Sequence, residues 1–168
     1  MGKRFSLSFL FIATGLLFSL NTACDKNDDN GDNGTEPLNE DKLVQLVNDL
    51  RTNGTICGSD SMPGVDPISW NGKLERAAAI HSQDMDENEF LSHTGSDGST
   101  LQDRIENVNY NWSTIGENVA NGYPDEEAVI TGWQESEGHC KNMMNEDFTE
   151  MGLAKSGNYW TMVLAAPR

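Results

Sequence analysis

The sequence has few basic residues, few cysteines and few histidines, and these shortages exclude several classes of protein. It has 11 Lys and Arg against 27 Asp and Glu, which gives a formal net charge of −16. Affinity for nucleic acid depends on Lys and Arg contacts with phosphates, and no basic stripe is present, so we expect no nucleic-acid partner. Neither an HExxH nor a CxxC pattern occurs, so residue spacing alone indicates no metal site. The 168 residues suffice for one domain with a substantial core.

Long apolar runs are also scarce, because the sequence contains a single one, from Phe5 to Leu20. Lys3 and Arg4 precede this run, and the small residue Ala23 follows it. This order is typical of a secretory signal, and we predict a signal peptide over residues 1–23. A single transmembrane helix is the alternative, but the run is short for a membrane span.

The stretch "LNTACDKNDDNGDNG" resembles a bacterial lipoprotein signal, in which Cys24 becomes the lipid-bearing mature N-terminus. Asn21 departs from the pattern, which has an aliphatic residue three positions before the cysteine. The acidic residues after Cys24 resemble the export signal of surface lipoproteins. We therefore expect an exported protein, held by its lipid in the outer membrane or at the cell surface, or else facing the periplasm. Residues 24–37, rich in Asp, Asn and Gly, are predicted to form a flexible acidic tether.

Of the three cysteines, Cys57 and Cys140 remain once Cys24 carries lipid. Disulfides persist in exported proteins, so a Cys57–Cys140 bridge is the simplest prediction. The neighbouring His139 leaves two alternatives open: half of a metal site, or a thiol activated by the imidazole.

Two helices are predicted near the start of the domain. The first runs from about Glu40 to Arg51, with Asn39 as its cap and Gly54 at its end, and an irregular loop follows over residues 55–67. Its apolar face is formed by residues at helical spacing: Leu43, Leu46, Val47 and Leu50. The second helix begins after Asn71, with a buried stripe of Leu74, Ala77, Ala78, His81 and Met85. His81 is expected either to make one hydrogen bond in the core or to line an inner cavity.

The second half of the chain alternates helical and extended patterns. Ser99 and Gln102 suggest a capping box that opens a helix through about Glu106. A further helix is predicted from Pro124, ending or bending at Gly138. Two β-rich runs flank residues 156–158 and predict an antiparallel hairpin. Helices followed by a hairpin indicate the α+β class, with helices packed on an antiparallel sheet.

Six blocks occur in a familiar order: "HSQDM", "FLSHTGSDGSTLQDRI", "GENVANGY", "GWQESEGHCKNMMN", "FTEMGL" and "YWTMVLA". Together they resemble the bacterial branch of the CAP superfamily, whose members are also called SCP-like domains. The superfamily joins cysteine-rich secretory proteins, antigen 5 and pathogenesis-related 1 proteins. The resemblance extends from about Leu38 to Ala165. It implies an α-β-α sandwich with a central antiparallel sheet and a cleft, and we place the domain at residues 38–168.

The resemblance also implies which residues line the cleft. His93, Glu117 and His139 match the family's cleft histidines and the glutamate of its "GEN" block, and several members bind a divalent metal such as zinc there. Two imidazoles and a carboxylate suit zinc with one open position. The alternative is a hydrogen-bonded His-Glu-His network that orders the cleft without a metal. Ser136 stands where eukaryotic members have a second Glu, which puts their full set of four cleft residues in doubt. Cys140 replaces an often basic residue, which fits a subfamily with the Cys57 bridge.

Two functions are compatible with these residues. The first, which we favour, is a monomeric, lipid-anchored binding module whose cleft takes a small ligand, a lipid or a component of the cell envelope. The second is a hydrolase that depends on a metal or uses His93, Glu117 and His139 as acid and base. No GxSxG motif is present, and Ser136 near His139 is more simply a polar cleft residue than a nucleophile. We expect His81 to lie near the cleft as a lining residue.

Overall fold

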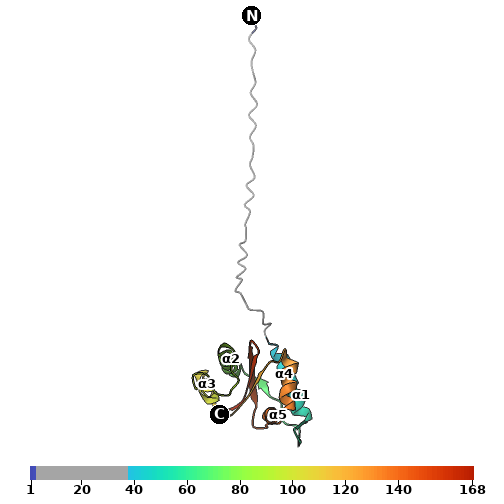
Figure 1. Ribbon diagram of the computed structural model, residues 1–168. Helices are drawn as coiled ribbons and strands as arrows, with labels where there is room; N and C mark the ends of the chain where they lie inside the picture. Colours follow the sequence, from blue (N-terminus) through green and yellow to red (C-terminus); the bar gives the residue numbers. More distant parts are fainter. Residues whose placement is uncertain (3–37) are drawn as a thin grey trace. The chain divides into compact units, whose positions relative to one another are not determined.

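The structure is a computed structural model that describes residues 1–2 and 38–168 (Figure 1). The predicted cleavage site, Cys24 and the tether lie outside these residues. Within the described part of the chain, no helix is both long enough and apolar enough to cross a membrane. The elements are, in order, α1 Glu40–Asn53, β1 Thr55–Cys57, β2 Asp60–Met62, β3 Ser69–Trp70, α2 Gly72–Glu87, α3 Leu101–Asn107, β4 Trp112–Asn121, α4 Glu126–Glu135, α5 Glu137–Met143, β5 Glu150–Ser156 and β6 Tyr159–Pro167.

A four-stranded sheet in the order β3-β5-β6-β4 forms the middle layer. β4, β5 and β6 are antiparallel neighbours, and β5 and β6 form the predicted hairpin around Gly157, whose φ is 51°. The sheet is not wholly antiparallel, because the two-residue strand β3 pairs in parallel with β5. β4 was not predicted as a strand, although it is the longest in the described chain.

Helices cover both faces of the sheet, with α2 and α3 on one side and α1, α4 and α5 on the other (Figure 1). Successive side chains of a strand point to opposite faces of the sheet, so β6 contributes residues to the cores on both sides. Trp160, Met162 and Leu164 belong to the core with α1 and α4, whereas Val163 and Ala165 belong to the core with α2 and α3. The α-β-α sandwich and the α+β class are therefore confirmed.

Three predicted helix boundaries are wrong by one or two residues, and for α3 and α4 the reason is that other side chains cap the helices. α3 is capped by Thr100, and its capping box pairs Thr100 with Asp103. α4 begins after Asp125, whose side chain accepts the Ala128 N–H at 2.9 Å. The break before α5 falls at Ser136, so the predicted bend at Gly138 lies inside α5.

The segment after α1 is a short β1–β2 hairpin joined to α5 by the Cys57–Cys140 disulfide, with Cα atoms 5.4 Å apart. Both cysteines are fully buried. The predicted bridge is thus present, and neither sulfur is a free thiol. Because Cys140 follows His139 in α5, the bridge fixes the helix that carries this histidine.

Candidate functional site

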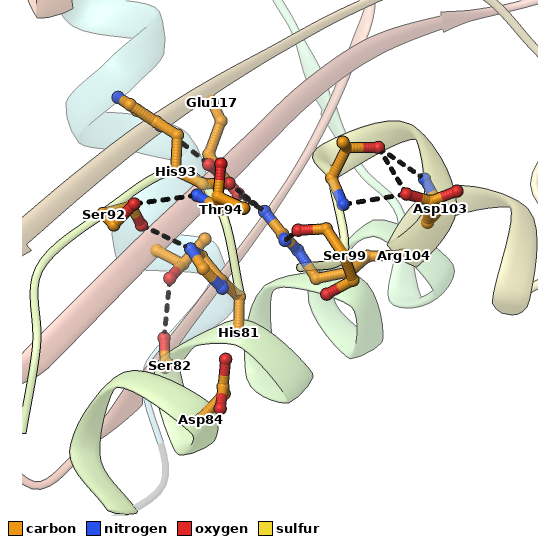
Figure 2. A network of polar contacts seen from close by, with 12 residues as sticks. His81, Ser82, Asp84, Ser92, His93, Thr94, Ser99, Asp103, Arg104 and Glu117 are labelled. Atoms are coloured by element: carbon orange, nitrogen blue, oxygen red, sulfur yellow. Dashed lines mark hydrogen bonds and ion pairs between the residues drawn. The ribbon is translucent and has the colours of Figure 1, made fainter. Parts of the chain in front are cut away.

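His93 lies in the loop between α2 and α3, and buried groups hold this loop from below (Figure 2). The His81 ring, on α2, uses Nε2 to donate a hydrogen bond to the Ser92 carbonyl at 2.7 Å. Arg104, on α3, donates to the carbonyl oxygens of His93 and Ser99, each at 3.1 Å. Both arms of the loop are therefore tied to the same guanidinium, which restricts where the imidazole of His93 can lie.

Glu117 connects the loop to the sheet. It lies in the middle of β4, and its carboxylate is almost completely buried. Its Oε1 accepts a hydrogen bond from His93 Nδ1 at 2.8 Å, and its Oε2 accepts one from Arg104 at 2.7 Å (Figure 2). A buried charge is tolerated when an opposite charge and hydrogen bonds compensate it. Arg104, only 2% exposed, supplies that charge from below.

The His93 side chain, in contrast, is 60% exposed. The site therefore consists of a buried Arg104–Glu117 ion pair that fixes an exposed imidazole through Nδ1 and leaves Nε2 toward solvent. A carboxylate on one ring nitrogen selects the tautomer and the orientation of the other. With Nδ1 donating to Glu117, Nε2 is an acceptor in the neutral ring and a donor in the imidazolium.

His139 enters from the opposite helical layer, on α5. Its carbonyl accepts the Asn118 side-chain amide at 3.1 Å. Asn142 donates to the Asn118 side chain at 3.0 Å and to the Glu117 carbonyl at 3.1 Å. These amides join α5 to β4 at Glu117 and Asn118. The structure therefore brings His139 to the same region of β4 as His93.

The environments of the histidines shift their pKa values in different directions. The hydrogen bond that His93 donates to the Glu117 carboxylate raises the pKa of His93 above its ordinary value. Burial lowers the pKa of His139, and the nearby charge of His93 lowers it further. Burial also lowers the pKa of His81. Near neutral pH the site thus pairs an imidazole that readily takes a proton with one that stays neutral.

His81 and Ser136, the other two residues predicted to line the cleft, lie at the margins of the histidine site. His81 is fully buried, makes its single hydrogen bond to Ser92, and lines a 180 Å³ cavity together with Arg104. Ser136 is half-buried between α4 and α5, and its hydroxyl makes no capping bond to α5. His81 therefore supports the histidine loop, while Ser136 is polar surface near His139.

The geometry does not assemble the predicted metal ligands. Within residues 1–2 and 38–168, no three His, Cys, Asp or Glu side chains are placed to hold a metal ion. Both carboxylate oxygens of Glu117 are already engaged, one by His93 and one by Arg104. The arrangement as it stands fits an ion-pair network better than a three-ligand zinc centre, and metal binding stays a prediction.

Arg104, Asn118 and Asn142 were not identified from the sequence as parts of the site. A signal for Arg104 exists, because it occupies the apolar stripe of its helix. Leu101, Ile105 and Val108 lie near it on the same stripe and pack in the core. A charged residue on a buried stripe needs a buried partner. The two asparagines carry no comparable signal, because their roles depend on how α5 meets β4.

Comparison with known proteins agrees with this architecture. The profile of the CAP family, described as the cysteine-rich secretory protein family, matches residues 44–164. This range covers most of the chain and includes every residue of the site. The chain therefore belongs to the CAP family of cysteine-rich secretory proteins.

Several relatives are similar over the same region. The chain is 32% identical to the uncharacterized membrane protein YlbC of Bacillus subtilis over 126 residues, which is 75% of this chain and 34% of that protein. It is 32% identical to the uncharacterized protein YkwD of the same organism over 124 residues, 73% of this chain and 45% of that protein. The chain thus spans less than half the length of these curated relatives.

Two solved structures share the fold. An extracellular SCP-domain protein of Bacillus anthracis superposes with a TM-score of 0.62 and 28% identity, covering 78% of this chain and 45% of that one. An outer surface protein of Borrelia burgdorferi gives a TM-score of 0.63 at 19% identity, covering 76% of this chain and 92% of that one. The second likeness concerns the fold alone.

Proposed function

We propose that this chain is an exported, lipid-anchored binding module whose binding face is the exposed His93 imidazole together with His139. The observation that carries the proposal is the buried Arg104–Glu117 pair beneath His93. Burying two charges costs free energy that must be offset elsewhere, and here the pair fixes one exposed ring. A side chain held in place before binding loses little entropy when a ligand arrives.

The chemistry of this face favours a ligand with an anionic oxygen, such as a phosphate or carboxylate of an envelope lipid or polymer. Protonated His93 offers Nε2–H as a charge-assisted donor, and its raised pKa extends that state toward neutral pH. The net charge of −16 opposes approach of an anion. At physiological salt, charges beyond about 8 Å are largely screened, so the local donor dominates.

A direct test uses the full chain in detergent, with glycerol phosphate and phosphatidylglycerol mixed into the detergent micelles as probes. Binding to either probe should be tighter at about pH 6 than at about pH 8, and His93→Ala should remove it. The matched control Asn121→Ala alters an exposed residue at the far end of β4 and should bind normally. Binding that ignores pH or persists in His93→Ala would refute the proposal. If the chain cleaves casein and His93→Ala does not, the hydrolase would replace the binding module as the proposed function.

Metal binding is tested separately. Both oxygens of Glu117 are engaged by His93 and Arg104, which leaves His93 and His139 as the candidate ligands. If His93 and His139 bind zinc, zinc should raise the melting temperature by mass action, because the free energy of unfolding increases by about 2.7 kcal/mol at a free zinc concentration 100-fold above the dissociation constant. The rise should disappear below about pH 6, where protons compete for the imidazoles. His93→Ala and His139→Ala should each abolish the rise. Glu117→Gln should leave the rise unchanged if only the two imidazoles bind zinc, and should reduce it if the carboxylate is a third ligand. A melting temperature insensitive to zinc would refute metal binding.

Export and anchoring rest on the N-terminal pattern, and the extracellular SCP-domain relative is consistent with export. Replacing Cys24 with Ser should release the protein from the membrane fraction, because the lipid would be lost. Ala23→Ser, which leaves the cysteine in place, serves as the control. A Cys24→Ser protein that still sediments with membranes would contradict lipidation and support the transmembrane alternative.

A further inference from the structure

A groove that shares no lining residue with the histidine site lies at the end of the sheet where β4 begins and β6 ends. Cavities of 580 Å³ and 380 Å³ form it, and both are lined by Tyr110, Asn111 and Arg168. Glu117 lies five residues beyond the start of β4, which is about 17 Å at about 3.3 Å per residue. The groove is therefore spatially separate from the site proposed above.

One wall of the groove holds a carboxylate in a fixed orientation. The Tyr110 hydroxyl donates to Glu150 Oε2 at 2.7 Å, and the Asn71 amide donates to the same oxygen at 2.8 Å. Burial, together with the bond to Glu150, raises the pKa of Tyr110, so its hydroxyl stays a donor. Within the described residues, no donor reaches the other oxygen, Oε1. Glu150 thus offers the groove an immobilised acceptor.

The other wall combines an aromatic ring with planar polar groups. The half-buried Trp112 lines the smaller cavity, and α3 contributes Gln102 and Glu106 beside it. Gln102 donates to Glu106 Oε1 at 2.8 Å, which orders both side chains on the helix surface. Asn111 is exposed between the two cavities. An indole is therefore surrounded by amides, which can donate and accept hydrogen bonds, and by a carboxylate, which accepts them.

We propose that this groove binds a neutral oligosaccharide. A sugar ring has an apolar C–H face that can pack on the Trp112 indole, and its rim of hydroxyls can bond to Glu150, Glu106 and Asn111. An ionic ligand of either sign is not favoured, because the cationic side chains of Lys73 and Arg168 offset the carboxylates of Glu150 and Glu106 in the walls. A purely apolar ligand would remove these polar groups from water without replacing their hydrogen bonds. Two connected cavities suit a chain of sugars better than a single one.

The test follows indole N–H resonances of the full chain in a detergent without a sugar headgroup. The probes are maltotetraose, cellotetraose and tetra-N-acetylchitotetraose. The Trp112 resonance, assigned with Trp112→Phe, should shift saturably with at least one probe, with a dissociation constant of about 1 mM or below. The indoles of Trp133 and Trp160 donate to backbone carbonyls in the core and should not move.

Two exposed asparagines at opposite ends of β4 supply matched variants. Asn111→Ala should weaken binding about fivefold to tenfold, the effect of one lost hydrogen bond, whereas Asn121→Ala should not change it. His93→Ala should also leave sugar binding intact. A failure of the sugar-binding proposal can therefore be distinguished from a failure of the proposed histidine site. The proposal is overturned if no probe shifts Trp112 at about 10 mM, which is tenfold above the expected constant, or if Asn111→Ala binds as well as the parent chain.

Discussion

Arg104 determines how the histidine site is held, although none of its bonds faces solvent. It neutralises Glu117 and bonds two loop carbonyls while 2% exposed. Its Nε is buried and has no partner among the described residues. Replacing Arg104 alone is therefore expected to lower the stability of the fold more than replacing Arg104 and Glu117 together.

Replacing Arg104 alone by Met should destabilise the fold by about 3–5 kcal/mol, because Glu117 would remain buried without a counter-charge. The double variant Arg104→Met with Glu117→Leu should recover a large part of this loss, since neither partner is left charged. Urea unfolding of the two variants measures the difference. Equal loss in the single and double variants would show that the pair does not act as a unit.

The chain has only three histidines, so an NMR titration resolves each pKa. His93 should titrate above its ordinary value of 6.5, and His81 and His139 below it. Glu117→Gln should lower the pKa of His93, because the hydrogen bond that His93 donates to the carboxylate is the largest cause of its shift. Glu106→Gln, on the exposed face of α3, is the control and should leave that pKa unchanged. A His93 pKa at or below that of His139 would contradict the geometry.

The same shifts have opposite consequences for stability. The folded pKa of His93 is raised, so its stabilisation is complete below about 6.5 and is lost as pH rises through the folded value. The folded pKa values of His81 and His139 are lowered, so their contribution is complete above about 6.5 and is lost as pH falls. Stability should therefore decline below about pH 6 less steeply in His81→Gln, after allowance for its lower starting stability.

The packing of α2 on β5 depends on a single glycine. A Cβ at Gly152 would overlap the backbone of Leu74 and Glu75, in the first turn of α2. Ala154, the next residue of β5 on that face, is also small and lies in the same core. Side chains this small let the helix axis approach the sheet closely enough for α2 to present His81 beneath the histidine loop.

Gly152→Ala should therefore destabilise by about 1–3 kcal/mol or more, because α2 must shift away from the sheet. Gly138→Ala is the matched control, since a Cβ there meets nothing within 4 Å and the residue lies inside α5. That change should be neutral or stabilising by up to about 1 kcal/mol. Thermal unfolding distinguishes them, and equal midpoints would show that the contact at Gly152 relaxes freely.

For the whole molecule, charge and covalent linkage act in opposite directions. The net charge of −16 produces self-repulsion in the compact state. The disulfide joins residues 83 positions apart and restricts the unfolded chain. The bridge also connects the β1–β2 hairpin to α5, so it contributes to the placement of His139 as well as to stability.

The melting temperature should consequently rise as NaCl increases from about 10 mM to about 0.3 M, because screening weakens the repulsion between surface carboxylates. KCl should have the same effect, which separates screening from specific ion binding. The Cys57→Ser/Cys140→Ser variant should be less stable by about 2–5 kcal/mol and retain the same salt response. A melting temperature that falls with salt would indicate that surface ion pairs outweigh the repulsion.

Much of the fold follows from short-range patterns. The apolar stripes of α1 and α2, the cap at Asn39, the hairpin around Gly157 and the pairing of Cys57 with Cys140 were all predicted correctly. Each depends on residues a few positions apart, or on a simple count of cysteines. The family motifs placed His93, Glu117 and His139 in one region, and the structure brings the two histidines to β4, the strand of Glu117, from its two flanking layers.

Other features depended on the assembled structure. The starts of α3 and α4 differ from the prediction by one and two residues because Thr100 and Asp125 cap these helices, and β3 joined the sheet in parallel through a contact 80 residues away. Arg104 pairs with Glu117 across 13 residues, from a helix to a strand. Burial decides whether such a pair forms, because only exclusion of water makes an unpaired carboxylate costly. That exclusion is created by the packing of both layers on the sheet, and no local segment of the sequence contains it.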